Sequence, residues 1–198
     1  MSHGWFFRRF FAAGLSVLLL LLFSTRTVFA GTVETAAEPP PTVILDAGHG
    51  GPDGGATGVN GAHDKDLNLA MVLLIADLLR GEGVEVILTR TDDSLPITEE
   101  QDGSGHRKRW DVTNRIAFTK LYPDALFVSI HMNLYPVEKV SGLQVWYAKT
   151  AGSAELAEIV RRRVVADLQP ENKRQCKQAD RSIRLLDSAE SVAILVEC

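Results

Sequence analysis

The feature that most constrains the fold of this chain is the alternation of short apolar runs with longer segments of helical periodicity. Segments 67–82, 108–121 and 153–168 carry apolar residues at helical spacing and predict helices. Short apolar runs predict strands at 43–46, 84–89, 125–131, 142–148 and 192–197, and more weakly at 183–186. Segment 91–107 is polar and contains glycine, which predicts a loop. The alternation is typical of a single α/β domain, with a mixed, mostly parallel central sheet and helices on both faces.

The first 30 residues have the pattern of a secretory signal peptide. A basic start with Arg8 and Arg9 is followed by an unbroken apolar run over 10–23 and by small residues up to Ala30. The rival interpretation is an uncleaved membrane anchor, but a run of this length crosses only about two-thirds of a roughly 30 Å hydrocarbon core. Segment 31–41 contains three consecutive prolines and predicts a linker, so we expect the domain to occupy 42–198.

Charge and cysteine content exclude two classes of protein. Residues 1–30 hold three arginines and no acid, so without them 18 basic and 25 acidic side chains remain and the formal charge moves from −4 to −7. Such a domain lacks the basic surface of a nucleic-acid binder, and we expect no nucleic-acid partner. Cys176 and Cys198 are too few for a disulfide scaffold, and either can be an ordinary free thiol.

Three residues able to bind a metal or transfer a proton stand at predicted strand ends. His49 follows the first strand, His131 ends the third, and Glu197 ends the last. Active sites of open α/β sheets lie beyond the carboxyl ends of strands, and two histidines with a carboxylate suffice for a catalytic zinc. The spacing also admits plainer roles, since a histidine can be a hydrogen-bonded loop or core residue. For Glu197 a functional role is favoured over a structural ion pair, because a buried carboxylate without a partner is costly.

Two other motifs have plain alternatives. The glycine-rich loop over 48–61 could cradle a phosphate, but it lacks the lysine ending of such loops and carries acidic residues instead. Two basic runs, 107–109 and 161–163, are most simply solvated helix surface, although one of these side chains could hold a substrate carboxylate.

Seven short motifs follow one another from the first predicted strand to the last: 43–51 (VILDAGHGG), 53–56 (DGGA), 65–69 (KDLNL), 89–90 (TR), 129–133 (SIHMN), 141–142 (SG) and 195–197 (LVE). In order and spacing they resemble the zinc-dependent N-acetylmuramoyl-L-alanine amidases of the type-3 cell-wall amidase family. Within that family, the run at 51–55 and the polar insert before Arg107 are most similar to the germination-specific spore-cortex amidases.

The resemblance implies a role for each candidate residue. His49 and His131 are expected to bind Zn²⁺, and Asp64 occupies the third ligand position, where most relatives have glutamate. Aspartate has the same donor atoms on a shorter stem, so ligation requires the loop to approach more closely, and the adjacent His63 is a fallback ligand. Glu197 is expected to be the catalytic carboxylate. Asp46 and Asn133 are candidates for orienting ligands or substrate.

The implied activity is zinc-dependent hydrolysis of the amide between N-acetylmuramic acid and L-alanine. The implied partner is peptidoglycan, in the cell wall or the spore-cortex space, with the membrane involved only through the N-terminal export segment. Relatives continue beyond the position of Cys198, so we expect a C-terminally truncated catalytic domain. Two alternatives stay open: a catalytically inactive peptidoglycan-binding or regulatory homologue, and a zinc carboxypeptidase acting on the stem peptide.

Overall fold

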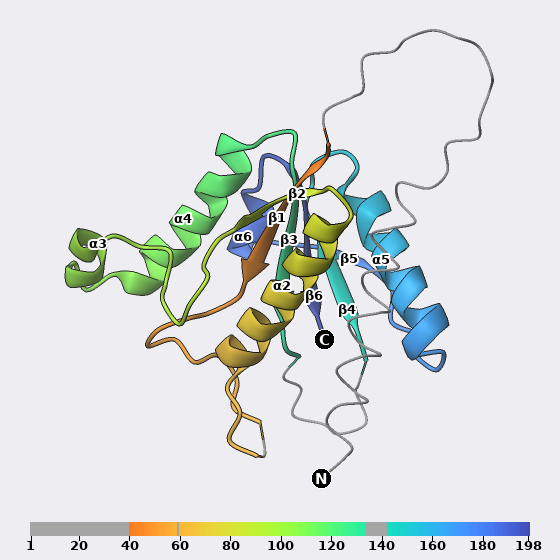
Figure 1. Ribbon diagram of the computed structural model, residues 1–198, viewed down its shortest axis with the longest axis horizontal. Helices are drawn as coiled ribbons and strands as arrows, with labels where there is room; N and C mark the ends of the chain where they lie inside the picture. The colour runs from red at the N-terminus through yellow and green to blue at the C-terminus, as the bar shows by residue number, and fades with distance from the viewer. Residues whose placement is uncertain (1–39, 59, 134–141) are drawn as a thin grey trace, which may run out of the picture.

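The computed structural model describes residues 40–58, 60–133 and 142–198 (Figure 1). The predicted signal peptide and nearly all of the predicted linker lie outside these ranges, as does Ser141 of one matched motif. Within the described ranges, every helix is too short or too polar to span a bilayer.

A six-stranded sheet in the order β2-β1-β3-β6-β4-β5 forms the centre of the domain. β1 pairs in parallel with β2 and β3, β3 with β6, and β4 with β5, whereas β4 and β6 are antiparallel. The prediction of a mixed, mostly parallel sheet is therefore confirmed. The strands are β1 (Thr42–Ala47), β2 (Glu85–Leu88), β3 (Leu126–His131), β4 (Gln144–Tyr147), β5 (Lys177–Gln178) and β6 (Val192–Glu197).

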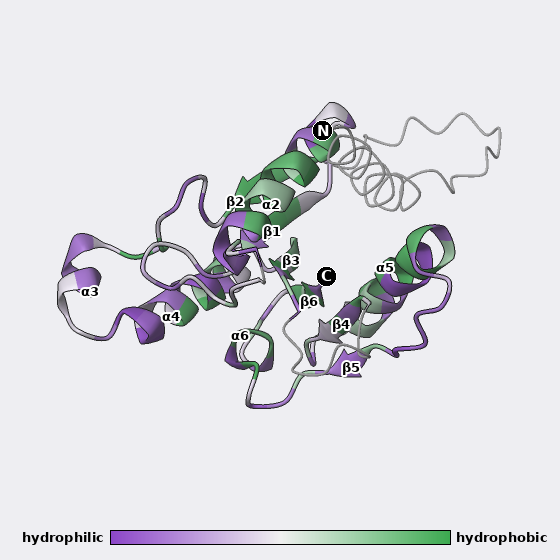
Figure 2. Ribbon diagram, turned by 90° about the horizontal axis from the view of Figure 1, so that it is seen from below, coloured by the Kyte–Doolittle hydropathy of each residue, from purple (hydrophilic) through white to green (hydrophobic). Residues whose placement is uncertain are grey.

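Helices cover both faces of the sheet, as predicted (Figure 2). α2 and α5 pack on the face that receives Val43 and Leu45 of β1, whereas α4 and α6 pack on the face that receives Ile44. The central strands bury both faces, which explains their almost continuous apolar sequences. The helices are α2 (Asp64–Gly81), α3 (Glu99–Gly103), α4 (Arg107–Leu121), α5 (Ser153–Leu168) and α6 (Arg184–Asp187).

Two local predictions are wrong, and one short strand was not predicted. Segment 183–186 was predicted as a strand but forms most of α6, whose Leu185 and Leu186 are buried in the core shared with α4. The predicted loop 91–107 contains α3, which begins with a capping box between Thr98 and Gln101. β5 was not predicted, because two exposed polar residues at a sheet edge give no periodic signal.

The strand directions decide where a site can form. β1, β3 and β6 are mutually parallel neighbours, so their carboxyl ends meet at one edge of the sheet. α2 begins beside the same edge, because the first turn of this helix follows directly from the glycine-rich loop after β1. The fold thus collects the ends of three strands and the start of one helix.

The core packing predicts a large difference between two apolar side chains. Phe127 is 0% exposed between β1 and β6, whereas Leu121 at the end of α4 is 72% exposed. Phe127→Ala should lower the free energy of unfolding by about 3–5 kcal/mol through lost burial and an unfilled cavity. Leu121→Ala should change it by less than about 0.5 kcal/mol. Chemical denaturation measures both, and equal effects would contradict the assigned core.

Candidate metal centre

Three of the predicted side chains lie together at this edge of the sheet. His49, Asp64 and His131 each offer one potential ligand atom, and these atoms all lie within 4.8 Å of one another. His49 Nε2 is 3.2 Å from Asp64 Oδ2, and the two imidazole rings meet edge to face with centroids 4.9 Å apart. Zinc bonds of about 2.0–2.2 Å in tetrahedral geometry place ligand atoms roughly 3.3–3.6 Å apart. The separation of His49 Nε2 and Asp64 Oδ2 is close to this value, and two imidazoles with one carboxylate are a donor set that suits a zinc ion with an open fourth position.

His49 is held in an unusual backbone conformation between two acidic side chains. Its φ is +62°, in the left-handed region that non-glycine residues seldom adopt, and glycines flank it on both sides. His49 Nδ1 lies 3.0 Å from Asp53 Oδ2, while Nε2 faces Asp64. The hydrogen bond with Asp64 is the largest cause that raises the pKa of His49, with Asp53 adding to it and burial opposing it.

His131 has the opposite electrostatic environment. Burial lowers the pKa of His131 to about 4, so its ring is neutral near pH 7. The ring packs directly on the backbone of Gly48, where a Cβ atom would lie 2.3 Å from His131 Nε2. Only glycine at position 48 leaves room for this imidazole beside His49.

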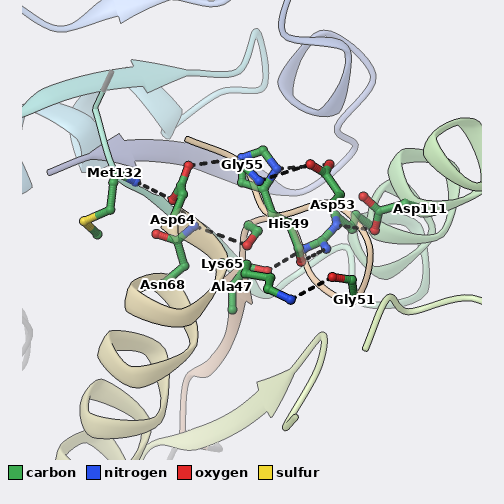
Figure 3. A network of polar contacts seen from close by, with 12 residues as sticks. Ala47, His49, Gly51, Asp53, Gly55, Asp64, Lys65, Asn68, Asp111 and Met132 are labelled. Carbon is green, nitrogen blue, oxygen red and sulfur yellow. Dashed lines mark hydrogen bonds and ion pairs between the residues drawn. The ribbon is translucent and has the colours of Figure 1, made fainter. Parts of the chain in front are cut away.

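Asp64 reaches the cluster because it is the first residue of α2 (Figure 3). Its Oδ1 accepts hydrogen bonds from Asn68 Nδ2 at 2.5 Å and from the Met132 amide at 3.0 Å, which leaves Oδ2 facing His49. Burial acts to raise the pKa of Asp64, but the hydrogen bonds from His49 and Met132 hold it below its usual value. The loop approaches closely: a Cβ atom on Gly55 would lie 2.7 Å from Asp64 Cβ. The short stem of aspartate is thus matched by a close loop.

A buried ion pair lies beneath the His49 loop. Asp46 is 0% exposed, and its carboxylate accepts hydrogen bonds from the Arg115 guanidinium, the Ser129 hydroxyl at 2.5 Å and the Thr89 hydroxyl at 2.7 Å. Burial opposes ionisation of Asp46, but Arg115 and the two hydroxyl groups hold its pKa below the usual value. Arg115 also donates to the carbonyls of Ala47 and His49, each at 2.8 Å.

A second buried arginine joins the loop to α2. Arg90 donates to the carbonyls of Ala47 at 2.9 Å, Gly48 at 3.1 Å and Lys65 at 2.8 Å. The two arginines therefore hold three consecutive carbonyls of the segment that carries His49, and Arg90 ties that segment to the first turn of the helix that carries Asp64. Neither arginine was predicted to be a functional residue from the sequence. Arg115 could have been noticed as a cation on an apolar helix face, and Arg90 as part of a matched motif.

The remaining predicted residues lie around the cluster in different ways. Glu197 ends β6 in register with His131, half-buried, and is not one of the three clustered side chains. His63 is exposed and contacts the Thr57 hydroxyl at 3.2 Å, also outside the cluster. The amide of Asn133 donates to the carbonyl of Cys198. Asp46 supports the His49 loop through Arg115.

The basic run at the start of α4 lies close to the cluster. Arg107 pairs with Asp102, and Arg107 and Lys108 line a cleft of about 320 Å³ together with Asp53, the partner of His49. The prediction that these cations are solvated helix surface holds for Arg107, whose side chain is about half exposed. No described contact distinguishes a substrate-binding role for them.

Comparison with known proteins decides the family. Residues 43–198 match the N-acetylmuramoyl-L-alanine amidase family. The chain belongs to this family. It is 32% identical over 156 residues to the germination-specific N-acetylmuramoyl-L-alanine amidase of Bacillus subtilis, a match that covers 78% of this chain and 65% of that relative. The amidase domain described above therefore spans less than two thirds of that relative's length.

Solved structures agree with this assignment. The CwlD amidase from Clostridioides difficile, solved in complex with the GerS lipoprotein, has 35% identity and a TM-score of 0.73, covering 80% of this chain and 81% of that one. An N-acetylmuramoyl-L-alanine amidase from Clostridium difficile 630 has 28% identity and a TM-score of 0.67, covering 81% and 80%. The family and the α/β fold predicted from the sequence are confirmed.

The buried ion pair predicts a strong dependence of this amidase domain on Arg115. Arg115→Ala leaves the Asp46 carboxylate buried without its cation and should lower the free energy of unfolding by about 3–5 kcal/mol. The matched control, Arg109→Ala, removes an exposed arginine from the same helix and should change stability by less than about 0.5 kcal/mol. Similar midpoints for both variants in urea denaturation would refute the role assigned to Arg115.

Proposed function

We propose that this chain hydrolyses the amide between N-acetylmuramic acid and the L-alanine of peptidoglycan, using zinc held by His49, Asp64 and His131. The observation that carries the proposal is the convergence of these three side chains at the sheet edge of a domain of this family. The similarity to two N-acetylmuramoyl-L-alanine amidases, one from Bacillus subtilis and one from Clostridium difficile, supports the reaction.

The protonation of His131 and the orientation of His49 both suit metal binding. His131 is neutral and offers a nitrogen lone pair without losing a proton, because burial lowers its pKa to about 4. Asp53 orients His49 by accepting from Nδ1, so that Nε2 is directed to the cluster, as outer carboxylates do for zinc-binding histidines. Bound zinc supplies a Lewis acid that polarises the scissile carbonyl and lowers the pKa of the attacking water.

Glu197 is the proposed general base and acid. Its register partner across β3 and β6 is His131, so its backbone lies about 4.8 Å from that of a proposed ligand. In the proposed reaction a Glu197 carboxylate oxygen takes one proton from the attacking water, and the water oxygen bonds to the lactyl carbonyl carbon. Glu197 then donates this proton to the nitrogen of L-alanine as the C–N bond breaks, which leaves a free amine and a lactyl carboxylic acid, and this acid ionises by giving the second proton of the water to solvent.

The proposed place of action is outside the cytoplasmic membrane. We propose residues 1–30 as the signal peptide, 31–41 as a linker and 42–198 as the catalytic domain, and we take peptidoglycan as the partner. The similarity to the germination-specific amidase of Bacillus subtilis favours the spore cortex as the substrate.

Digestion of peptidoglycan tests the reaction and the role of Glu197 together. The wild-type protein should release stem peptides with a free L-alanine amine, and a chelator should abolish the release. Glu197→Ala should bind zinc as the wild type does but lose about 10²–10⁴-fold in turnover, whereas the exposed control Glu171→Ala should keep it. Mass spectrometry of the muropeptides and metal analysis measure both properties.

Each alternative has its own outcome in that digestion. Wild-type turnover by Glu197→Ala would remove this residue from the mechanism. New carboxylates within the stem peptide would indicate a carboxypeptidase, and wall binding without any cleavage would indicate an inactive binding homologue.

The raised pKa of His49 predicts that zinc binding releases protons. A histidine whose pKa exceeds 6.5 is more than half protonated at pH 6.5 and must lose that proton to bind metal, whereas His131 is already neutral. Asp53→Asn removes one cause of the raised pKa of His49, so this variant should release fewer protons at pH 6.5, and the difference should vanish as the pH rises. Calorimetry in buffers of different ionisation enthalpy counts the protons. Equal release by the two proteins at pH 6.5 would contradict this assignment.

A further inference from the structure

The side chain of Asn68 contacts both segments that carry the clustered residues. It lies on α2 one turn after Asp64 and is 0% exposed. Its Nδ2 donates to Asp64 Oδ1 at 2.5 Å (Figure 3). The same nitrogen donates to the Gly48 carbonyl at 3.2 Å. Because both neighbours are only acceptors, the orientation of this amide is determined: the nitrogen faces them and the oxygen points away.

The other atom of this amide has no partner. Asn68 Oδ1 is buried and lacks a hydrogen bond within the described part of the chain. An unsatisfied buried acceptor costs free energy, which an apolar side chain of similar size would avoid. Both acceptors that Asn68 serves also have another donor, since Met132 donates to Asp64 Oδ1 and Arg90 to the Gly48 carbonyl. Hydrogen-bond satisfaction of these two groups therefore does not require an asparagine.

What Asn68 adds is the orientation of the Asp64 carboxylate. Two donors converge on the same oxygen and fix the carboxylate plane: the Asn68 amide on α2 and the backbone amide of Met132, the residue directly after β3. The second oxygen, Oδ2, is left facing His49 Nε2 at 3.2 Å. The contact with Gly48 adds a second constraint, because it fixes the spacing between α2 and the loop that precedes His49.

We propose that Asn68 is a positioning residue, which holds Asp64 so that Oδ2 alone is presented to the metal; this inference rests on the proposed zinc site. Removal of Asn68 should free the carboxylate to rotate and loosen the loop against α2. Outer hydrogen-bond partners of zinc ligands typically contribute about 10–100-fold to metal affinity. An asparagine with only a structural role would affect folding stability, and its removal would leave the zinc affinity of the folded protein unchanged.

Zinc affinity of the folded protein, measured by competition with a chromophoric chelator, tests this role. Asn68→Ala should bind zinc about 10–100-fold more weakly than the wild type. The matched control is Val72→Ala, one turn further along the same buried face of α2, which should lose stability but keep wild-type zinc affinity. Asn68→Ser keeps a short hydroxyl donor, so its zinc affinity should lie between those of the wild type and Asn68→Ala. This variant replaces Asn68→Ala in the test if the alanine variant does not fold.

A double-mutant comparison separates positioning from direct binding. If Asn68 acts mainly through Asp64, Asn68→Ala should cause a much smaller loss of zinc affinity once Asp64→Ala is present, because only the contact with the Gly48 carbonyl then remains to be lost. Unchanged affinity in the single Asn68 variants, or the same fold-loss with and without Asp64, would overturn the inference. Failure of the wild-type protein itself to bind zinc would instead overturn the proposed function.

Discussion

A carboxylate and a guanidinium buried together at the end of β1 support the rest of the site. Asp46 and Arg115 are both removed from water, and the cost of burying two charges is offset only when nearly all their hydrogen-bonding groups are satisfied. Here the Ser129 and Thr89 hydroxyl groups donate the further hydrogen bonds that the Asp46 carboxylate accepts. The Arg115 guanidinium donates its further hydrogen bonds to Asp111 and to two backbone carbonyls. The carbonyls belong to Ala47 and His49, so the ion pair holds the loop as well as itself.

The strained backbone of the loop depends on this support. A positive φ at His49 costs free energy and persists where the surroundings determine it. Arg115 and Arg90 together fix the carbonyls of residues 47–49, and the missing side chain of Gly48 gives His131 its room. The geometry of the cluster therefore arises from residues that do not belong to it, and the two histidines meet only because β1 and β3 are parallel neighbours.

The sequence predicts the sheet better than its edges. β1, β3 and β6 are buried on both faces and give continuous apolar runs, so these strands and the meeting of their ends follow from pattern alone. The short run at 183–186 is ambiguous because two adjacent leucines suit a buried strand or one helical turn equally, and packing against α4 decides for the turn. α2 was expected from residue 67 because its first turn is polar, although this turn begins at Asp64.

The site was predictable only in part. His49 and His131 were selected by their places at strand ends, and Asp64 by the family resemblance. Only the folded loop shows that Asp64, and not His63, lies beside the two histidines. Arg115 and Asn68 look like ordinary polar residues of helices, since nothing local shows that long-range contacts bury them. The propensity of a residue carries no information on partners that lie tens of positions away in the chain.

The proposed zinc site at the carboxyl edge of the sheet depends on all of these supports. A crystal structure of the zinc-loaded protein, with anomalous differences recorded at the zinc edge, would locate the ion and its ligands. We expect one zinc ion about 2.0–2.2 Å from a nitrogen of His49, a nitrogen of His131 and one oxygen of Asp64. Zinc bound through His63 or a cysteine sulfur, or no zinc beside the three side chains, would contradict it.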